Sequence, residues 1–285
     1  MIKRAFHKAL DAVPGAEGAW IALNRIVGRW PPPSFSGWGM TTDTLPPWFA
    51  DGGDPVTRDF IAANTEIVQR VCDGRFFLSQ FTDVADQRRL LGELMWRHFI
   101  VFWSARYAAQ NANTDVTTLV ECGVCDGLTA HFAMKAVAGR VAFATVLYDA
   151  WEEMKGDYLL ETEHAAAGNY AYLALESTRR NLREFSDRTT FVKGYIPESF
   201  ATAPLPTSVA WLHIDLNAAL PTKAALDTLY DRMPAGGTIL FDDYGWRAYQ
   251  DTKAVIDAFA AASSGLLLPV PTGQALFFKS CRPIT

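Results

Sequence analysis

The stretch that decides the fold is Leu119-Val120-Glu121-Cys122-Gly123-Val124-Cys125-Asp126-Gly127. Residues 117–120 are β-branched or apolar, which is typical of a strand that is buried on both faces. Residues 128–138 have the composition of a helix, so Gly123 and Gly127 are predicted to lie in a strand-to-helix turn. An α/β sheet holds nucleotide-like ligands at such a turn, where glycine permits close approach and the helix N-terminus offers free amides.

The acidic residue at the start of this turn favours one kind of ligand. A dinucleotide-binding turn would have glycine at position 121, and its amides would face a pyrophosphate. Glu121 stands there instead, and its carboxylate repels phosphate but suits an ammonium or sulfonium group. The pattern indicates S-adenosylmethionine, with Glu121, Gly123 and Gly127 as cofactor-binding candidates. The alternative is that the two glycines only end the strand and begin the helix, with no ligand bound at the turn.

Composition limits the classes of function. The chain has 285 residues, 49% of them hydrophobic, which suffices for one large α/β core. A net charge of -5 provides no basic surface for nucleic acid. No run approaches the roughly 18 apolar residues of a membrane helix, and no signal-peptide core is present, so we expect a soluble cytoplasmic protein with no membrane partner.

Cysteine usage agrees with a reducing compartment. The four cysteines suggest no disulfide framework. Cys122 and Cys125 form a C-x-x-C pair, but no second pair and no nearby histidine pair completes a metal set. We therefore interpret both as filling positions of the turn. The other two are Cys72 and Cys281.

Residues 1–115 are predicted to form an N-terminal extension of helices and loops, a lid that also shapes the acceptor pocket. Prolines and aromatic residues exclude a helix over residues 30–48, which we interpret as a flap over the cofactor or a strap on the core. Helices are predicted over residues 55–72, with Asp54 as a cap, and over residues 83–112.

From residue 116 onward, strand and helix patterns alternate, which predicts a doubly wound parallel sheet. A second strand over residues 141–147 leads into Asp149. An acidic residue at this place binds a ribose diol in related folds. Asp149 as a helix cap is an equally good interpretation.

The third strand is predicted after a long helix. The helix covers residues 165–185, and the strand covers residues 189–192. Gly194 and Tyr195 follow in the next turn. Because the first three strands end on the same edge of the sheet, these two residues are candidates to flank the adenine.

Three aspartates follow two further strands. A buried strand ends in Asp215, and the strand over residues 238–241 ends in Asp242 and Asp243. Adjacent parallel strands end side by side, so the three carboxylates should converge. Their mutual repulsion requires raised pKa values or a cation, and a hard divalent ion is the simplest solution. The alternative is that one aspartate caps a helix while another faces solvent.

These motifs resemble the macrocin-O-methyltransferase (TylF-like) family over residues 117–279. Its members are class I S-adenosylmethionine-dependent enzymes, several of which methylate sugar hydroxyls with magnesium. The specific matches are those of the fourth and fifth strands. The resemblance is carried by Glu121-Cys122-Gly123-x-x-x-Gly127, Tyr148-Asp149-Ala150-Trp151-Glu152-Glu153-Met154, residues 191–199, His213-Ile214-Asp215-Leu216-Asn217, Pro221-Thr222, Ala225-Leu226, Pro234-x-Gly236-Gly237 and Asp242-Asp243-Tyr244-Gly245.

The resemblance implies a seven-stranded, mostly parallel sheet with a reversed last strand and residues 116–285 as the methyltransferase domain. It implies that Glu121, Gly123 and Gly127 hold the methionine moiety and that Asp149 holds the ribose. Magnesium would be held by Asp215, Asp242 and Asp243.

The resemblance also implies a reaction. Asp215 is the first candidate for the general base, and His164 is the second. Asn217 and Ala219 depart from the aspartate and tyrosine that the family often has, so contacts with the acceptor can differ. The acceptor would be a hydroxyl of a sugar or another small natural product, and the protein is a possible homo-oligomer.

Two other classes remain open. A dehydrogenase on the related dinucleotide fold is disfavoured by Glu121. A non-catalytic protein that keeps the fold would be expected to lose the acidic triad, which is present here.

Overall fold

The computed structural model describes residues 54–280, and these residues build one seven-stranded sheet in the order β3-β2-β1-β4-β5-β7-β6. Strands β1 to β5 run parallel to one another, and β7 runs antiparallel to both β5 and β6. The predicted doubly wound sheet with a reversed last strand is confirmed. The strands are β1 Thr117–Cys122, β2 Phe143–Asp149, β3 Thr189–Lys193, β4 Trp211–Ile214, β5 Thr238–Phe241, β6 Gly265–Pro269 and β7 Ala275–Lys279.

Two expectations fall on residues that the structure does not describe. These are the aromatic loop over residues 30–48 and Cys281.

Strand β1 lies between β2 and β4 and contributes to two separate cores. Leu119 packs into the cluster on one face, and Val120 and Cys122 pack into the cluster on the other. Successive side chains of a strand point to opposite faces, so a strand covered on both sides is apolar without interruption. This is why residues 117–120 lack an alternating pattern.

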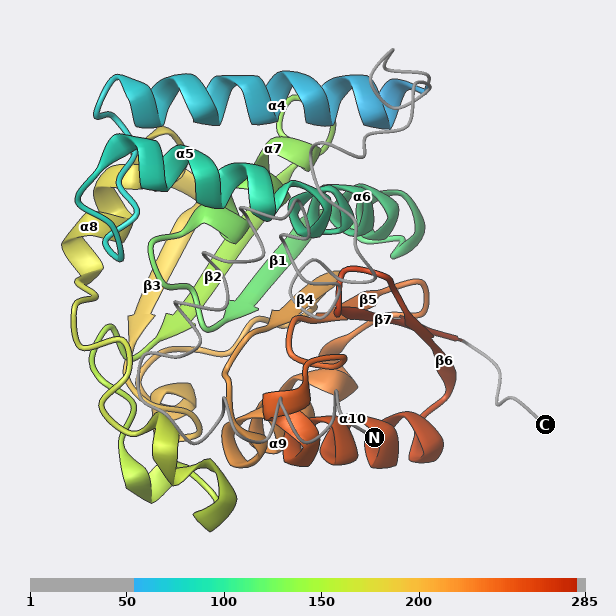
Figure 1. The fold of residues 1–285 in the computed structure, drawn as a ribbon. Helices are drawn as coiled ribbons and strands as arrows, with labels where there is room; N and C mark the ends of the chain where they lie inside the picture. Colours follow the sequence, from blue (N-terminus) through green and yellow to red (C-terminus); the bar gives the residue numbers. More distant parts are fainter. Residues whose placement is uncertain (1–53, 281–285) are drawn as a thin grey trace, which may run out of the picture.

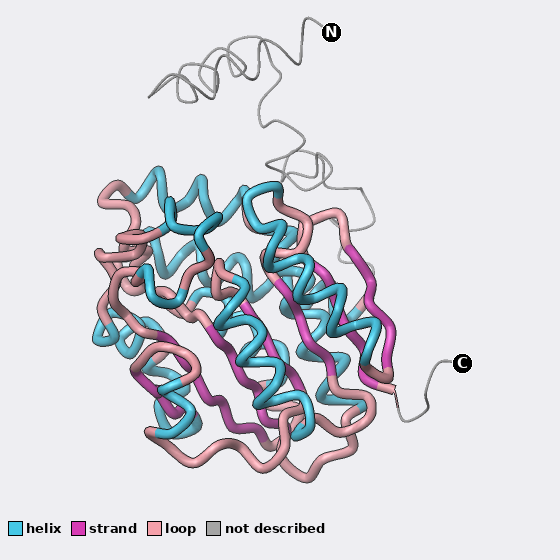
Figure 2. The backbone as a smooth tube through the Cα atoms, turned by 90° about the horizontal axis from the view of Figure 1, so that it is seen from below, coloured by secondary structure: helices cyan, strands magenta, loops and turns pink. Residues whose placement is uncertain are grey.

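Helices cover both faces of the sheet. Figure 1 shows α4, α5, α6 and α7 above the sheet, with α9 and α10 below it. Figure 2 views the molecule from below, and there helices run alongside the strands. The helices are α4 Pro55–Cys72, α5 Val84–Glu93, α6 Met95–Asn111, α7 Leu128–Val137, α8 Leu175–Asn181, α9 Ala219–Leu229 and α10 Gln250–Ala262. Short 3-10 turns cover Gly156–Tyr158, Glu161–Ala166, Arg183–Arg188, Glu198–Ala201, Tyr230–Arg232 and Arg247–Tyr249.

Two predicted helices differ in the structure. The helix expected over residues 83–112 is divided into α5 and α6 at Leu94, shortly after Gly92, a poor helix former. The helix expected over residues 165–185 is reduced to α8. Gly168 and Tyr170 have positive φ angles of 84° and 67°, and a right-handed helix cannot continue through such residues.

The first described helix, α4, begins as the sequence predicts. The Asp54 side chain accepts hydrogen bonds from the amides of Val56 and Thr57, and Pro55 stands in the first turn. Within residues 54–280, no helix combines the length and apolar character that crossing a bilayer requires.

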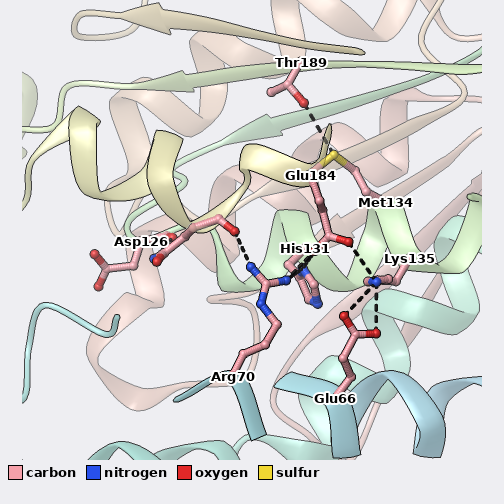
Figure 3. Close-up of polar contacts among 9 residues, drawn as sticks. Glu66, Arg70, Asp126, His131, Met134, Lys135, Glu184 and Thr189 are labelled. Carbon is pink, nitrogen blue, oxygen red and sulfur yellow. Dashed lines mark hydrogen bonds and ion pairs between the residues drawn. The ribbon is translucent and has the colours of Figure 1, made fainter. Parts of the chain in front are cut away.

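A charged cluster, which we call the α4 network, joins α4 to the layer beneath it (Figure 3). Arg70 pairs with Glu184 and donates to the Asn181 carbonyl at 2.7 Å. Lys135 Nζ lies 2.9 Å from carboxylate oxygens of both Glu66 and Glu184. Two cations thus meet two anions, and the charge is balanced within the protein.

His131 completes the α4 network. It is fully buried beside Arg70, and burial, reinforced by the charges of Arg70 and Lys135, holds its pKa well below the usual range. The imidazole is therefore neutral, which keeps the balance of two cations and two anions.

Candidate functional site

A cavity of about 810 Å³ opens where the parallel strands end. Turns after five strands supply one wall, and helices α5 and α6 supply another. In open α/β sheets, ligands bind at this carboxyl edge. Representative lining residues are Gly123, Asp149, Gly194, Asp215 and Asp242 from the strand ends, with Leu90, Leu94 and Arg97 from the helices.

The two glycines of the turn after β1 are each required at their position, but for different structural reasons. Gly123 has φ +86°, and a Cβ there would lie 1.8 Å from the carbonyl oxygen of Asp215, so only glycine fits. Gly127 has φ +83°, and a Cβ there would lie 2.9 Å from Leu182 Cδ1. Gly123 lines the cavity and Gly127 does not. Gly127 serves the packing of α7.

Glu121 is buried, and only one of its two carboxylate oxygens has a polar partner among the described residues. Its side chain is almost inaccessible, and Oε1 lies 2.9 Å from Nδ1 of His213. Its Oε2 has no hydrogen-bond partner among the described residues. Burial raises the pKa of Glu121 well above its usual range, and the nearby Asp215 and Asp149 add to the rise. A positively charged guest relieves this arrangement.

Asp149 acts as a cap for the β1 turn. Its Oδ2 accepts from the amides of Val124 (2.6 Å) and Cys125 (2.9 Å), and Oδ1 accepts from the amide of Trp151 (2.6 Å). The amides expected to be free for a ligand are thus already occupied. A carboxylate has about four acceptor positions, so one remains towards the cavity that Asp149 lines.

Gly194 and Tyr195 line the cavity beside Asp149. The amide of Gly194 donates to the Asp149 carbonyl at 2.9 Å. The Tyr195 ring stacks on Tyr158 with centroids 4.7 Å apart, and its hydroxyl donates to the Glu153 carbonyl at 2.7 Å. The two tyrosines form an aromatic surface at this end of the cavity.

The structure brings Asp215 and Asp242 together with His213. One ligand atom from each of these three lies within 4.8 Å of the others. Asp243 follows Asp242 in the chain, and its Oδ2 accepts a hydrogen bond from the backbone amide of Asn217 at 2.9 Å. Burial raises the pKa of Asp243 well above its usual range, and the charge of Asp215 adds to the rise. We call Asp215, Asp242 and Asp243 the acidic triad.

Asp242 has two partners that sequence reasoning missed. Arg97 of α6 forms an ion pair with its Oδ2, and Gln274 Nε2 donates to its Oδ1 at 2.7 Å. Nothing in the sequence places either residue beside the triad, because each reaches it from a distant element.

His213 is the third residue that was missed. Its Nε2 lies 3.7 Å from Asp242 Oδ1 and has no hydrogen-bond partner among the described residues. Burial lowers its pKa to about 4, so the imidazole is neutral at pH 7. Its position two residues before Asp215 was a usable signal, because side chains i and i+2 share a strand face.

Asn217 connects the acids to two tyrosines. Its Nδ2 donates to Asp215 Oδ1 at 3.1 Å, and its Oδ1 accepts from the hydroxyls of Tyr249 (2.6 Å) and Tyr170 (3.3 Å). Burial and the nearby Asp215 and Asp243 raise the pKa of both tyrosines, so both remain neutral donors. An amide here avoids adding a fourth negative charge.

His164 and the cysteine pair take other roles. His164 is exposed and lies outside the cavity lining, so the second candidate for the base is not at the site. Cys122 and Cys125 are free cysteines, and burial raises the pKa of both thiols. They are protonated at neutral pH and do not suit a metal or redox site.

A family model described as a methyltransferase domain matches residues 120–244. The O-methyltransferase NovP superposes with a TM-score of 0.56 at 20% identity, covering 65% of this chain and 80% of NovP. The chain has the fold of class I methyltransferases. The calicheamicin methyltransferase CalS11 superposes with a TM-score of 0.53 at 16% identity, covering 75% of this chain and 91% of CalS11.

No curated protein sequence matches the chain. The methyltransferase domain model does not name the macrocin-O-methyltransferase family, so that closer resemblance stays a prediction. The methyltransferase fold explains why the cavity lies at the carboxyl ends of the strands.

Proposed function

We propose that the chain is an S-adenosylmethionine-dependent O-methyltransferase that acts on a hydroxyl of a sugar or similar small natural product, assisted by magnesium. The observation that carries the proposal is the surplus of acid in one cavity. Glu121, Asp149 and the acidic triad all line it, and within residues 54–280 Arg97 is the one lysine or arginine that pairs with the triad. A sulfonium group and a divalent ion are the two positive guests that would balance this charge.

The end of the cavity formed by Glu121, Gly123 and Asp149, which we call the donor end because the methyl donor would bind there, fits the cofactor. Glu121 offers an unpaired, buried Oε2, and Gly123 leaves the turn without a side chain at the close approach. Asp149 keeps one acceptor position for a ribose hydroxyl, and Gly194 and Tyr195 would flank the adenine. S-adenosylmethionine, when bound, supplies a methyl carbon that is activated by positively charged sulfur.

The acidic triad fits a divalent ion. We propose that Asp215, Asp242 and Asp243 hold magnesium. Ligand atoms of Asp215, Asp242 and His213 lie within 4.8 Å of one another, and His213 Nε2 has no hydrogen-bond partner among the described residues. Oxygen ligands are those that magnesium prefers. The ion, when bound, supplies positive charge beside the acceptor oxygen.

Asp215 is the proposed general base. It is less buried than Asp242 and Asp243, and Asn217 Nδ2 fixes the orientation of its carboxylate. It would accept the proton of the acceptor hydroxyl as that oxygen bonds to the methyl carbon, while the bond from this carbon to sulfur breaks and S-adenosylhomocysteine leaves. Neutral Tyr170 and Tyr249 stand beside it and keep the Asn217 amide oriented.

The acceptor side is the proposed role of the N-terminal extension. Leu90 of α5, Val101 of α6 and Leu94 between the two helices line the cavity, together with charged side chains of the same helices. The apolar side chains would orient the body of an acceptor and exclude water from the reacting hydroxyl. We propose a small-molecule acceptor, and a cytoplasmic location stays a prediction.

Substituting the triad tests the separation of roles. Asp242→Asn or Asp243→Asn should abolish magnesium-dependent methyl transfer, because each removes a charge that the ion needs. The affinity for S-adenosylhomocysteine should stay within about threefold, since the hydrogen bonds and the ion pair of these two side chains are with Arg97, Gln274 and Asn217 and not with Glu121 or Asp149. Isothermal titration calorimetry and a methyl-transfer assay on a panel of hydroxylated acceptors measure the two effects.

The exposed Asp227→Asn is a matched control, because Asp227 pairs only with Lys223 in the residues described. An affinity for S-adenosylhomocysteine that collapsed together with activity would refute the division into donor end and ion site. Stabilisation by a nicotinamide cofactor instead of S-adenosylhomocysteine would support a dehydrogenase and overturn the assignment.

A further inference from the structure

Arg97 occupies a special position in the acidic cavity. Its guanidinium pairs with Asp242 Oδ2 and lies over the Trp246 ring, 5.6 Å from the centroid. The side chain is largely buried, and it reaches the triad from α6, a helix outside the strand–turn–helix units. Among residues 54–280, no other lysine or arginine forms an ion pair with the acidic triad.

The two oxygens of Asp242 are not equivalent. Gln274 Nε2 donates to Oδ1 at 2.7 Å, and His213 Nε2 lies 3.7 Å from the same oxygen. Gln274 is almost completely buried, so this hydrogen bond is sheltered from water. The oxygen with room for a further positive partner is Oδ2, and Arg97 holds it.

A guanidinium cannot release its charge by losing a proton within the ordinary pH range. It therefore cannot share Oδ2 with a second cation without direct repulsion. A divalent ion that takes Asp242 as a ligand is repelled by the nearby guanidinium, so its binding favours the displacement of Arg97.

We propose that Arg97 is a built-in counter-ion, which holds the place of the divalent ion on Asp242 and is exchanged for it. The inference rests on the proposed function, because it concerns the ion of that site. Arg97 stabilises the acidic cavity before the ion arrives. It is a positioning residue, and it sets the affinity of the ion site from the N-terminal extension.

The direct test measures ion binding without turnover. Arg97→Gln removes the charge and keeps an amide donor for Asp242, and Arg97→Met removes both. Mn²⁺ is the probe, because its free concentration is measured by electron paramagnetic resonance. We expect both variants to bind Mn²⁺ about tenfold to a hundredfold more tightly, the size of effect that an adjacent charge has on a carboxylate.

Two control variants separate charge from packing. Arg97→Lys keeps a positive charge over Trp246 and should bind Mn²⁺ within about threefold of the unmodified chain. Arg89→Met removes another cavity arginine, one that pairs with Asp86 and Glu93, and it should leave the affinity unchanged.

Thermal unfolding gives a second readout. In chelator, Arg97→Gln should melt at a lower temperature than the unmodified chain, because Asp242 loses its counter-charge. Saturating Mn²⁺ should raise the melting temperature of Arg97→Gln more than that of the unmodified chain. If Arg97→Met does not fold, Arg97→Gln and Arg97→Lys still make the comparison.

Equal or weaker Mn²⁺ binding by the two neutral variants would overturn the exchange, and so would the absence of binding in all variants. The proposed function is scored separately, by titration with S-adenosylhomocysteine. A chain that exchanges Arg97 for Mn²⁺ but does not bind S-adenosylhomocysteine would keep this inference and lose the proposed function.

Discussion

The α4 network and the acidic cavity are both clusters of charged side chains, but only the first is balanced. In the α4 network, Arg70 and Lys135 meet Glu66 and Glu184, and His131 is neutral. In the acidic cavity, the triad meets Arg97, with Glu121 and Asp149 close by and a neutral His213. A balanced cluster needs no further partner, whereas an unbalanced cluster favours positive guests.

The positions of the two clusters explain the difference. The α4 network lies between helices, where side chains from α4 and α7 can be matched to one another (Figure 3). The acidic cavity lies where parallel strands end, and there several acidic residues converge by topology. We therefore expect substitutions in the α4 network to change folding stability alone, and those in the cavity to change binding as well.

The largest effect is expected from adding a side chain at Gly123, where the turn after β1 lies directly against the backbone of Asp215. Gly123→Ala should lower the free energy of unfolding by about 4 kcal/mol, because the new Cβ meets the Asp215 carbonyl at a positive φ angle. It should also weaken binding of both S-adenosylhomocysteine and Mn²⁺, since Gly123 lies between their sites. Urea unfolding and calorimetry measure these changes.

Gly139→Ala is the matched control for that substitution. Gly139 also has a positive φ, +71°, but no atom lies within 4 Å of the position of its Cβ. It should cost only about 1–2 kcal/mol, the price of the backbone conformation, and leave both affinities unchanged. Equal losses at the two positions would show that the contact with Asp215 is unimportant.

An intermediate effect is expected in the balanced cluster. Arg70→Met should lower the free energy of unfolding by about 2 kcal/mol, because it removes the ion pair with Glu184 and the bond to the Asn181 carbonyl. Lys135 still neutralises part of the charge of Glu184, which limits the loss. Urea unfolding measures the loss, and binding of S-adenosylhomocysteine should not change.

The exposed Arg75, which pairs with Asp73 at 2.7 Å, provides the control. Arg75→Met should change the free energy of unfolding by less than about 0.5 kcal/mol. A change in ligand affinity after Arg70→Met would contradict the separation between the two clusters.

The smallest effect concerns pH and His131. Its pKa is lowered in the folded state, so below its ordinary value of 6.5 the unfolded chain binds a proton that the folded chain does not. Its contribution to stability is thus present above pH 6.5 and is lost as the pH falls, by about 1.4 kcal/mol per pH unit. His131→Phe should make stability less dependent on pH between 6.5 and 5.5, as urea unfolding at both pH values would show.

His98 remains in that variant as an internal reference. It is buried against Phe132, and burial lowers its pKa to about 3, so it also destabilises the folded state in acid. A variant with the same pH dependence as the unmodified chain would mean that His131 is not buried as a neutral base.

The sheet and its acidic edge could be predicted because they depend on local pattern and simple geometry. Uninterrupted apolar runs predicted buried strands, and parallel strands ending side by side predicted that Asp215 and Asp242 meet. Arg97 could not be predicted, since its place depends on how α6 packs against the sheet. Asp149 was open to two interpretations, because spacing alone does not show which amides its carboxylate accepts.

The short helix α8 could not be predicted either. Residues 165–185 have helical composition, but Gly168 and Tyr170 adopt left-handed conformations, and Tyr170 lines the cavity. Tyr170 then reaches Asn217, a tertiary contact that overrides local propensity. Longer-range contacts of this kind are not visible in composition or periodicity.

Asp149 forms hydrogen bonds with the turns that follow three strands, β1, β2 and β3. Its carboxylate holds the turns after β1 and β2, and its carbonyl accepts from Gly194 after β3. The donor end of the cavity is therefore preorganised, and a guest that binds there loses little conformational entropy of the loops. The opposite wall, formed by α5 and α6, takes no part in these hydrogen bonds, so its side chains can be substituted without loosening the three turns.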